Sequence, residues 1–310
     1  MDAVVERIAV RHAALGIRPE QYTLIGRYLL GAVGTVLGDA VTPAVAAAWD
    51  EVYWLFAVRL IGREARLYQG AGVTDREPFR PVTVLARERA ATDTVSFTLA
   101  GDVPFRAGQY ISVVADLPDG TRQIRQYSLS GAPGEPLCIT VRRVPGGAVS
   151  GWLHATVRAG DTLTVSPPYG SFTLRPGDHP LLLASAGVGI TPMASIVAQV
   201  AAGQPDRPVT LAHAERTPDR HALRDRVDAH GARLTNFDHL VWYATEHGAL
   251  DPARLPVAPD TEAYLCGPVL FMRVVRAALL ARGVPAERIR CEVFGSDRFA
   301  GVAAAAPALP

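Results

Sequence analysis

The sequence contains only three cysteines among its 310 residues. Cys138, Cys266 and Cys291 lie far apart, and no two of them form a C-x-x-C pair. This spacing argues against a disulfide framework, a structural zinc site and an iron–sulfur cluster held by the chain's own cysteines. Few and unpaired cysteines fit a reducing compartment, so we expect the protein in the cytoplasm.

The sequence also lacks an excess of charge of either sign. Its formal net charge is +1 and 20% of its residues are charged, so no basic or acidic region indicates nucleic acid or a membrane surface as a partner. No early segment has the order of a signal peptide, and no uncharged run reaches the length of a membrane span. We therefore expect a soluble protein of about two or three domains, with its oligomeric state left open.

Apolar residues recur at helical spacing in three successive segments between residues 2 and 68, which predicts three helices. His12 lies on the apolar stripe of the first, Pro19 marks the start of the second, and Thr42-Pro43 marks the start of the third. We expect the second helix to bury Tyr22, Ile25, Leu29, Val33 and Val36, and the third to bury Val45, Trp49, Val52, Phe56 and Leu60. One further turn of that last stripe leads to Glu64.

His12, Tyr22 and Glu64 thus each lie on an inward-facing line. Burying an unpaired carboxylate costs free energy, so Glu64 requires a partner, and Tyr22 and His12 are the obvious candidates. The residues alone leave another interpretation open. In it, Glu64 pairs with Arg63 or Arg66 at the helix end, and His12 is an ordinary core histidine.

A second type of pattern begins after a predicted linker at residues 69–78. Residues 79–176 form short alternating segments separated by turn signals such as Pro118-Asp119-Gly120, which predicts a small antiparallel barrel. One segment ends in Arg125-Gln126-Tyr127-Ser128. A fixed cation, an aromatic face and a hydroxyl suit a planar ring with a phosphate tail, such as a flavin nucleotide, although the same residues are typical of a solvated strand face.

The run PGGAVSGWLH follows within the predicted barrel. Gly146 and Gly147 allow backbone N–H groups to approach a ligand, and Val149 and Ser150 begin a helix whose positive end can face a pyrophosphate. A hairpin turn followed by a helix cap fits the same residues equally well.

Residues 180–298 alternate apolar strands with amphipathic helices, which predicts a parallel sheet covered on both faces. Ligands of such sheets bind at the carboxyl ends of the strands. There, Gly187-Val188-Gly189-Ile190-Thr191-Pro192 follows its strand directly and opens a helix, as a phosphate-binding loop does, but it is not a G-x-G-x-x-G fingerprint. Cys266-Gly267-Pro268 ends a later strand at the same edge. Residues 299–310 are of low complexity and are expected to be disordered.

Taken in order, these motifs resemble the ferredoxin-NADP reductase superfamily over roughly residues 79–298. Gly108-Gln109-Tyr110 resembles a further family element, with Ala107 in place of its proline. The resemblance implies FAD contacts from Tyr110, Arg125, Gln126, Tyr127, Ser128, Gly146, Gly147, Val149 and Ser150. It implies nicotinamide dinucleotide contacts from Gly187, Val188, Gly189, Ile190, Thr191, Pro192, Cys266, Gly267 and Pro268. In the last strand and beyond, Glu292, Val293, Phe294, Gly295 and Ser296 match positions where an aromatic ring covers the flavin and a carboxylate tunes it.

The run RHAALGIRPEQY at residues 11–22, with Trp49 and Arg63-Glu64, is similar to the proximal half of the globin in flavohaemoglobins. The resemblance implies that His12 is the ligand of haem b, and that Tyr22 and Glu64 form the catalytic pair that hydrogen-bonds to it and makes it more basic. The distal helices of that globin have no counterpart in the sequence, so we expect the C-terminal half of a globin domain.

We therefore expect a multidomain chain. A partial all-α globin of three helices (1–70) precedes an antiparallel β-barrel FAD domain (79–176) and an α/β parallel-sheet NAD(P)H domain (180–298). The expected activity passes electrons from NAD(P)H through FAD to haem, for oxidation of nitric oxide to nitrate with O2. Two alternatives are a haem-free NAD(P)H:flavin reductase with a separate acceptor, and a half-globin module that docks a partner chain.

The sequence gives opposing signals on NADH versus NADPH. Glu215 would repel a 2′-phosphate, whereas Arg216 and Arg220 would attract one. We expect NADH.

Overall fold

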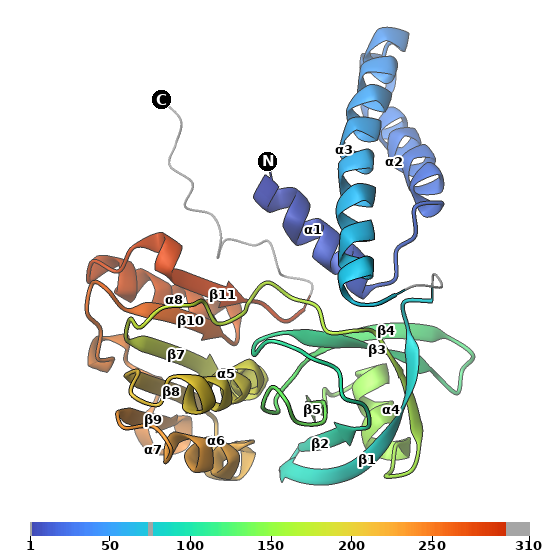
Figure 1. Ribbon diagram of the computed structural model, residues 1–310. Helices are drawn as coiled ribbons and strands as arrows, with labels where there is room; N and C mark the ends of the chain where they lie inside the picture. The colour runs from blue at the N-terminus through green and yellow to red at the C-terminus, as the bar shows by residue number, and fades with distance from the viewer. Residues whose placement is uncertain (1, 74–76, 296–310) are drawn as a thin grey trace.

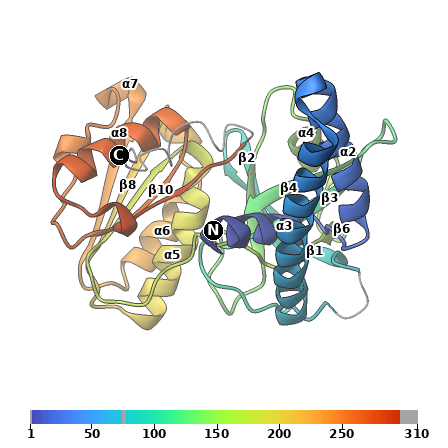
Figure 2. The ribbon, with the colours of Figure 1, turned by 90° about the horizontal axis from the view of Figure 1, so that it is seen from above.

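The structure, a computed structural model, describes residues 2–73 and 77–295. Ser296 and the predicted disordered tail at 299–310 lie outside the described residues. Three helices stand above a curled antiparallel sheet, and a parallel sheet with its helices lies beside it (Figure 1). Seen from above, α2 and α3 lie over the antiparallel sheet (Figure 2).

The N-terminal helices are α1 (Asp2–Ala14), α2 (Gln21–Leu37) and α3 (Pro43–Gly70), with a short turn η1 (Gly38–Ala40) before α3. The predicted three helices are therefore confirmed. The start of α3 follows from its sequence, because the side chain of Thr42 accepts a hydrogen bond from the Val45 N–H at 3.3 Å and Pro43 occupies the first turn.

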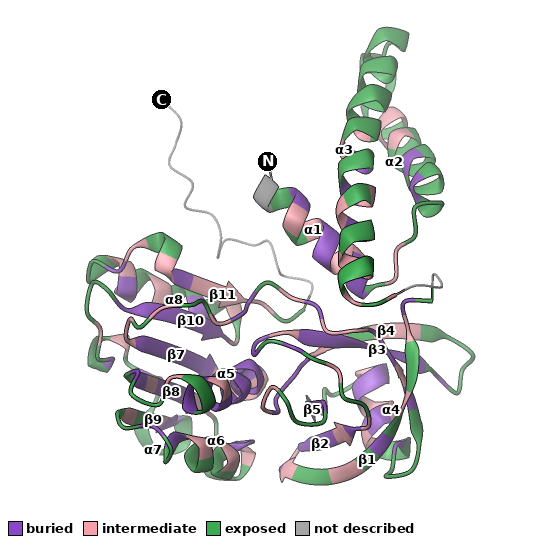
Figure 3. Cartoon of the chain, viewed as in Figure 1, coloured by how far each residue is buried: buried purple, intermediate pink, exposed green. Residues whose placement is uncertain are grey.

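The three helices share one buried cluster. Val5 and Ala9 of α1, Tyr22 of α2, and Ala57 and Leu60 of α3 form one buried cluster. The upper turns of α2 and α3 project beyond α1, and most of their residues are exposed (Figure 3). The predicted continuous buried stripes are therefore wrong for their outer residues, which are Ile25, Leu29 and Val36 in α2 and Val45, Trp49 and Val52 in α3.

The middle of the chain is an antiparallel sheet in the order β4-β3-β6-β1-β2-β5. A bridge between Leu129 and Ile139 links the two edges, so the sheet curls into a barrel around Phe97, Leu99 and Ile111. Its elements are β1 (Arg80–Ala91), β2 (Thr94–Leu99), β3 (Tyr110–Asp116), β4 (Arg122–Ser128), β5 (Cys138–Arg142), α4 (Ala148–Thr156) and β6 (Thr162–Val165).

The C-terminal part is a parallel sheet in the order β11-β10-β7-β8-β9. Alternate side chains of β7 point to opposite faces: Leu181 and Leu183 pack with helix α5, while Leu182 and Ala184 pack with helix α8. The strands are β7 (Leu181–Ala186), β8 (Val209–Glu215), β9 (Phe237–Tyr243), β10 (Glu262–Cys266) and β11 (Ile289–Glu292). The helices are α5 (Ile190–Gly203), α6 (Arg224–Gly231), α7 (Ala244–His247) and α8 (Val269–Ala281), with short turns η2 (Gly187–Gly189), η3 (Pro218–Arg220), η4 (Pro252–Arg254) and η5 (Ala286–Arg288).

Within the described part of the chain, every helix is too short or too polar to cross a membrane. The fold thus consists of helices above a barrel and a parallel sheet beside it, as the sequence predicts.

Candidate functional site

The base of the helical part brings together His12, Tyr22 and Glu64, one from each helix. Oε1 of Glu64 lies 2.8 Å from Nδ1 of His12 and accepts the Tyr22 hydroxyl at 2.5 Å. A carboxylate only accepts, so the ring proton of His12 lies on Nδ1, which leaves Nε2 with a free lone pair. Burial, and then the hydrogen bond to Glu64, raises the pKa of Tyr22, so this hydroxyl stays protonated.

The alternative interpretation of Glu64 does not match this arrangement. Arg63 pairs instead with Glu6, with Nη2 of Arg63 lying 2.7 Å from Oε1 of Glu6. Glu64 is only 2% exposed, so its charge is balanced by the two donors on Oε1 and not by an arginine at the helix end.

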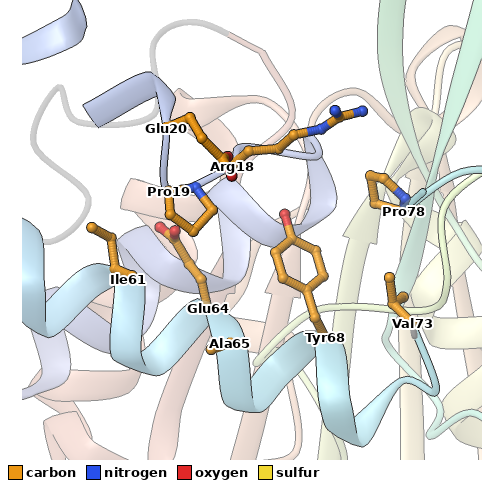
Figure 4. Close-up of a pocket in the computed structure, with 9 residues that line it drawn as sticks. All are labelled: Arg18, Pro19, Glu20, Ile61, Glu64, Ala65, Tyr68, Val73 and Pro78. Carbon is orange, nitrogen blue, oxygen red and sulfur yellow. The ribbon is translucent and has the colours of Figure 1, made fainter. Parts of the chain in front are cut away.

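A cavity of about 180 Å³ lies on the other side of Glu64 (Figure 4). Oε2 of Glu64 is buried and has no hydrogen-bond partner among the described residues. The hydroxyl of Tyr68 donates to the carbonyl oxygen of Ile17 at 2.8 Å, and Figure 4 shows this hydroxyl and the Glu64 carboxylate on the same side of α3. The lining residues are Arg18, Pro19, Glu20, Ile61, Glu64, Ala65, Tyr68, Val73 and Pro78.

The surroundings of His12 fit a haem group. Its side chain is 29% exposed, and Nε2 makes no hydrogen bond to any described residue. No cluster of three or more His, Cys, Asp or Glu side chains suited to a metal ion occurs in residues 2–73 or 77–295. A porphyrin brings its own nitrogen ligands to the iron and takes one from the protein, which Nε2 of His12 could supply. Helices α2 and α3 also carry exposed apolar side chains, among them Leu29, Trp49 and Leu55.

On the barrel, strand β4 presents Arg125 and Tyr127 to one face. Arg125 pairs with Val113 and Tyr127 with Ile111 across the ladder, and paired residues share a face. The Arg125 guanidinium is exposed and donates to the carbonyl of Ile124 at 2.9 Å and to Gln123 at 2.7 Å. Burial raises the pKa of Tyr127 to about 12, so this tyrosine is neutral at physiological pH.

Gly146 and Gly147 directly precede α4, a helix that packs against β4. Gly146 has a φ of +70° and open space where a Cβ would point. Ser150 accepts a hydrogen bond from the Val144 N–H at 3.2 Å, and Val149 is buried in the barrel core. The exposed Arg125 on β4 and the N–H groups at the start of α4 are the groups here that could bind the phosphates of a flavin nucleotide.

The structure separates the other predicted barrel residues from this face. Tyr110 pairs with Ser128 and lies in a cluster with Val10 and Ala14 of α1 and with Tyr169. It therefore belongs to the contact between the barrel and the helices. Gln126 points to the same side, because it pairs with Ser112 in that register. Flavin contacts from Tyr110, Gln126 and Ser128 stay predictions.

Two loops meet at the carboxyl edge of the parallel sheet. A Cβ on Gly189 would lie 2.2 Å from the carbonyl oxygen of Cys266, so only glycine allows this approach. Register pairs Cys266 with Ser185 on one side and with Glu292 on the other. The predicted dinucleotide residues are brought together here, with Val188 accepting the Thr191 hydroxyl at 2.9 Å and with Ile190 and Pro192 buried.

Cys266 is fully buried, and burial, followed by the nearby Glu292 carboxylate, raises the pKa of its thiol well above the usual range. It is thus a neutral small group at this edge and not a nucleophile. Gly267 follows it, and Pro268 precedes α8. After β11 the chain continues through half-buried Val293 to Phe294, which is 42% exposed, and Gly295.

The sequence analysis did not identify Arg142, a barrel residue whose side chain lies beside the glycine turn of the parallel-sheet part. The turn η2 contacts β5, and Arg142 ends β5. A Cβ on Gly187 would lie 2.8 Å from Nη1 of Arg142 and 3.7 Å from Oε2 of Glu215. The consecutive arginines at 142 and 143, directly after an apolar strand, were the available signal.

Comparisons with known proteins agree with this arrangement. A globin family model matches residues 1–59, and an oxidoreductase NAD-binding domain model matches residues 183–277. The flavohemoprotein of Bordetella pertussis is 39% identical, covering 96% of this chain and 81% of that protein. The flavohemoprotein of Deinococcus radiodurans is 40% identical, covering 97% and 81%.

Solved structures show the same likeness. The flavohemoglobin of Malassezia yamatoensis, solved with bound FAD and heme, matches with a TM-score of 0.88 and 31% identity over 95% of this chain and 80% of its own. The FAD/NAD-binding domain of the nitric oxide dioxygenase of Vibrio cholerae matches with a TM-score of 0.66 and 33% identity over 70% of this chain and 99% of its own.

Globin helices joined to an FAD-type barrel and an NAD-type parallel sheet define a flavin-dependent oxidoreductase linked to a globin. Because relatives of about 39% identity match over some four-fifths of their length, the chain belongs to the flavohaemoprotein family.

Proposed function

We propose that this chain is an NAD(P)H-dependent FAD oxidoreductase that passes electrons to haem for oxidation of nitric oxide to nitrate with O2. The observation that carries the proposal is the packing of the His12 helix onto the barrel. Ala13 and Ala14, directly after His12, lie in one buried cluster with Tyr110 and Tyr169 of the barrel. The helix of His12 therefore packs directly against the barrel that would hold the flavin, as electron transfer between flavin and haem requires.

Arg125 and Tyr127 would hold the flavin, together with the N-terminus of α4. The exposed guanidinium matches a phosphate, and the neutral phenol ring matches the ring system. When bound there, a flavin would supply the chemistry that links hydride transfer from the dihydronicotinamide to one-electron transfer.

The glycine turn 187–189 and the Cys266-Gly267 loop would position the nicotinamide dinucleotide. Because the two loops approach closely, only backbone atoms lie between them at this edge of the sheet. The N–H groups at the start of α5 would bind phosphate. Glu292 ends the neighbouring strand β11 and Phe294 follows it. We propose that the exposed Phe294 ring covers the flavin until the nicotinamide displaces it.

His12 would hold the haem through Nε2. Glu64 accepts the Nδ1–H at 2.8 Å, which fixes the ring orientation and makes Nε2 more basic. Tyr22 donates to the same oxygen and keeps the carboxylate in place. The haem, when bound, supplies the one-electron and oxygen chemistry by which nitric oxide becomes nitrate.

We also propose that residues 1–70, 79–176 and 180–298 act as a globin-like part, an FAD domain and an NAD(P)H domain. A cytoplasmic location is proposed on the support of three free cysteines, Cys138, Cys266 and Cys291.

Replacement of His12 tests the haem assignment. His12→Ala should abolish haem uptake, measured as the Soret absorbance after titration with haem, and should leave NADH oxidation by ferricyanide at the wild-type rate. His247→Ala, a change at an exposed histidine of the parallel-sheet unit, serves as the matched control and should retain both. Haem content that survives in the His12→Ala protein would show that another residue holds the haem.

A further inference from the structure

We propose that the cavity beside Glu64 is a binding site for a small primary ammonium ion. The charged head of the ligand would lie on Oε2 of Glu64, and its short apolar body would lie against the wall of the cavity. The site consists of this chain's own residues and does not need haem. The effect of such a ligand on haem binding rests on the proposed function.

The carboxylate of Glu64 is satisfied at one oxygen and unsatisfied at the other. Oε1 contacts His12 and Tyr22, whereas Oε2 is buried and has no hydrogen-bond partner among the described residues. Above the ordinary titration range of histidine, both groups on Oε1 are neutral, so the carboxylate keeps its charge without a cation beside it. A buried charge in this state costs free energy, and a cation that donates N–H bonds would relieve that cost.

The cavity has room for a small organic molecule. Its volume is about 180 Å³, and a protein cavity of about 150 Å³ holds a molecule of the size of benzene. Apolar side chains form much of its lining, from Pro19, Ile61, Ala65, Val73 and Pro78. Such a wall suits a short alkyl chain.

Tyr68 gives the cavity a second acceptor. Its hydroxyl donates its proton to the carbonyl oxygen of Ile17 at 2.8 Å, so only the lone pairs of the hydroxyl oxygen are left for a ligand. Figure 4 shows this hydroxyl and the Glu64 carboxylate on the same side of α3. An ammonium group has three donors and no acceptor, which matches a pair of acceptors.

The charges of the lining favour a cation over an anion. Glu20 and Glu64 supply two carboxylates, and among the described lining residues Arg18 supplies the only guanidinium. This guanidinium lies 3.3 Å from the carboxylate of Glu77 and is half exposed, so its charge is largely offset by Glu77 and solvent. The described lining therefore has an excess of negative charge.

A cation on Oε2 would also act on His12. It would share the charge of Glu64 with the Nδ1–H of His12, so Nε2 would become less basic and would hold haem more weakly. By linkage, bound haem would weaken the binding of the ammonium ion by the same factor.

Calorimetric titration of the haem-free protein with butylammonium at about pH 8 tests the site. At this pH a primary ammonium group is charged and histidine is ordinarily neutral. We expect saturable binding of butylammonium, binding of 1-butanol that is at least about tenfold weaker, and no binding of butyrate. These probes have chains of the same length and differ in charge.

Two variants with matched controls locate the ligand. Glu64→Gln should lower the affinity for butylammonium by about 10- to 100-fold, because a charge-assisted hydrogen bond is lost, whereas Glu51→Gln changes an exposed residue of α3 and should leave it unchanged. Ile61→Phe should prevent binding, because the larger side chain fills the cavity while Glu64 is kept. Val58→Phe, one turn earlier on the same helix at a residue that is 62% exposed, should retain binding.

The absence of saturable binding, or equal affinities for butylammonium and 1-butanol, would overturn the inference. Binding that both Glu64→Gln and Ile61→Phe retain would overturn it as well. An unchanged haem affinity at saturating butylammonium would overturn the coupling to His12. A protein that binds butylammonium but takes up no haem would instead overturn the proposed function, so the two failures are distinguishable.

Discussion

His12 and Glu64 are 52 residues apart in the chain, and their side chains share a hydrogen bond of 2.8 Å between Nδ1 and Oε1. The contact joins the last turn of α1 to the lower part of α3. It fixes the tautomer and the direction of the imidazole, because the buried carboxylate only accepts. The basicity of Nε2 therefore depends on a residue from another helix.

Glu64→Gln should weaken haem binding by about 10- to 100-fold, because a neutral amide accepts the Nδ1–H less strongly than a carboxylate does. Titration of the haem-free protein with haem measures this change. Glu51→Gln alters an exposed residue of the same helix and should have no effect. Equal haem affinities in the two variants would contradict the role given to Glu64.

Arg125→Ala should weaken FAD binding by roughly 10- to 100-fold, since the proposed contact pairs a guanidinium with a phosphate. Quenching of FAD fluorescence on binding provides the measurement. Arg122→Ala removes an exposed arginine from the same strand, where it pairs only loosely with Asp116 at 3.7 Å, and FAD affinity should stay within about twofold of wild type. If both variants lose FAD equally, Arg125 has no specific role.

Gly189→Ala should destabilise the parallel-sheet unit by at least about 2 kcal/mol and raise KM for NADH, because the new Cβ would meet backbone and not a movable side chain. The carbonyl oxygen of Cys266 would be 2.2 Å away. Gly203→Ala, at the other end of α5 with no atom near its Cβ position, should change stability by less than about 1 kcal/mol. Chemical denaturation and NADH kinetics of the two proteins decide the matter. A normal KM for NADH in the Gly189→Ala protein would show that NADH binding does not require the close contact between the Gly189 turn and the Cys266 loop.

Three histidine rings lie next to one another within the parallel-sheet unit. The rings of His213 and His221 are 4.4 Å apart between centroids, and those of His221 and His239 are 5.6 Å apart. Nδ1 of His221 lies 2.9 Å from the Tyr243 hydroxyl, and Nδ1 of His239 lies 2.7 Å from Asp228. Burial, followed by the neighbouring His239 and Arg224, lowers the pKa of His221 to about 4.

Stability should therefore fall as the pH decreases from about 6.5 toward about 4. In this window an unfolded chain binds a proton at His221 that the folded chain excludes, so the free energy of unfolding rises with pH. The contribution is at most about 3 kcal/mol, as a shift of this size implies. His221→Asn should flatten the pH dependence of the denaturation midpoint between these limits. An unaltered pH dependence of the midpoint would show that a group other than His221 causes it.

The order of the elements could be predicted from the sequence, because strand and helix periodicities in residues 79–295 differ clearly and each follows from which faces are buried. The convergence of the Gly187 and Cys266 loops could be predicted as well, since parallel strands bring their carboxyl ends to one edge. The meeting of His12, Tyr22 and Glu64 was one of two interpretations that the cost of burying a carboxylate left open, and the resemblance to flavohaemoglobins selected it.

The exposed upper turns of α2 and α3 could not be predicted in the same way. Periodicity reports that residues such as Trp49 and Val52 lie on one face, but it does not report whether anything covers that face. The ion pair between Asp93 and Arg220, 3.2 Å apart, could not be predicted either, because both residues lie in polar turns with no periodic pattern. The opposite placement of Tyr110 and Tyr127 required the strand register.

The most direct test of the proposed electron chain is a visible absorption spectrum of the protein, supplied with FAD and haem, before and after anaerobic addition of NADH. We predict that the flavin bands bleach and that a haem Soret band is present and shifts as the haem is reduced. Bleaching of the flavin without any Soret band would contradict the haem assignment and leave an NADH:flavin reductase.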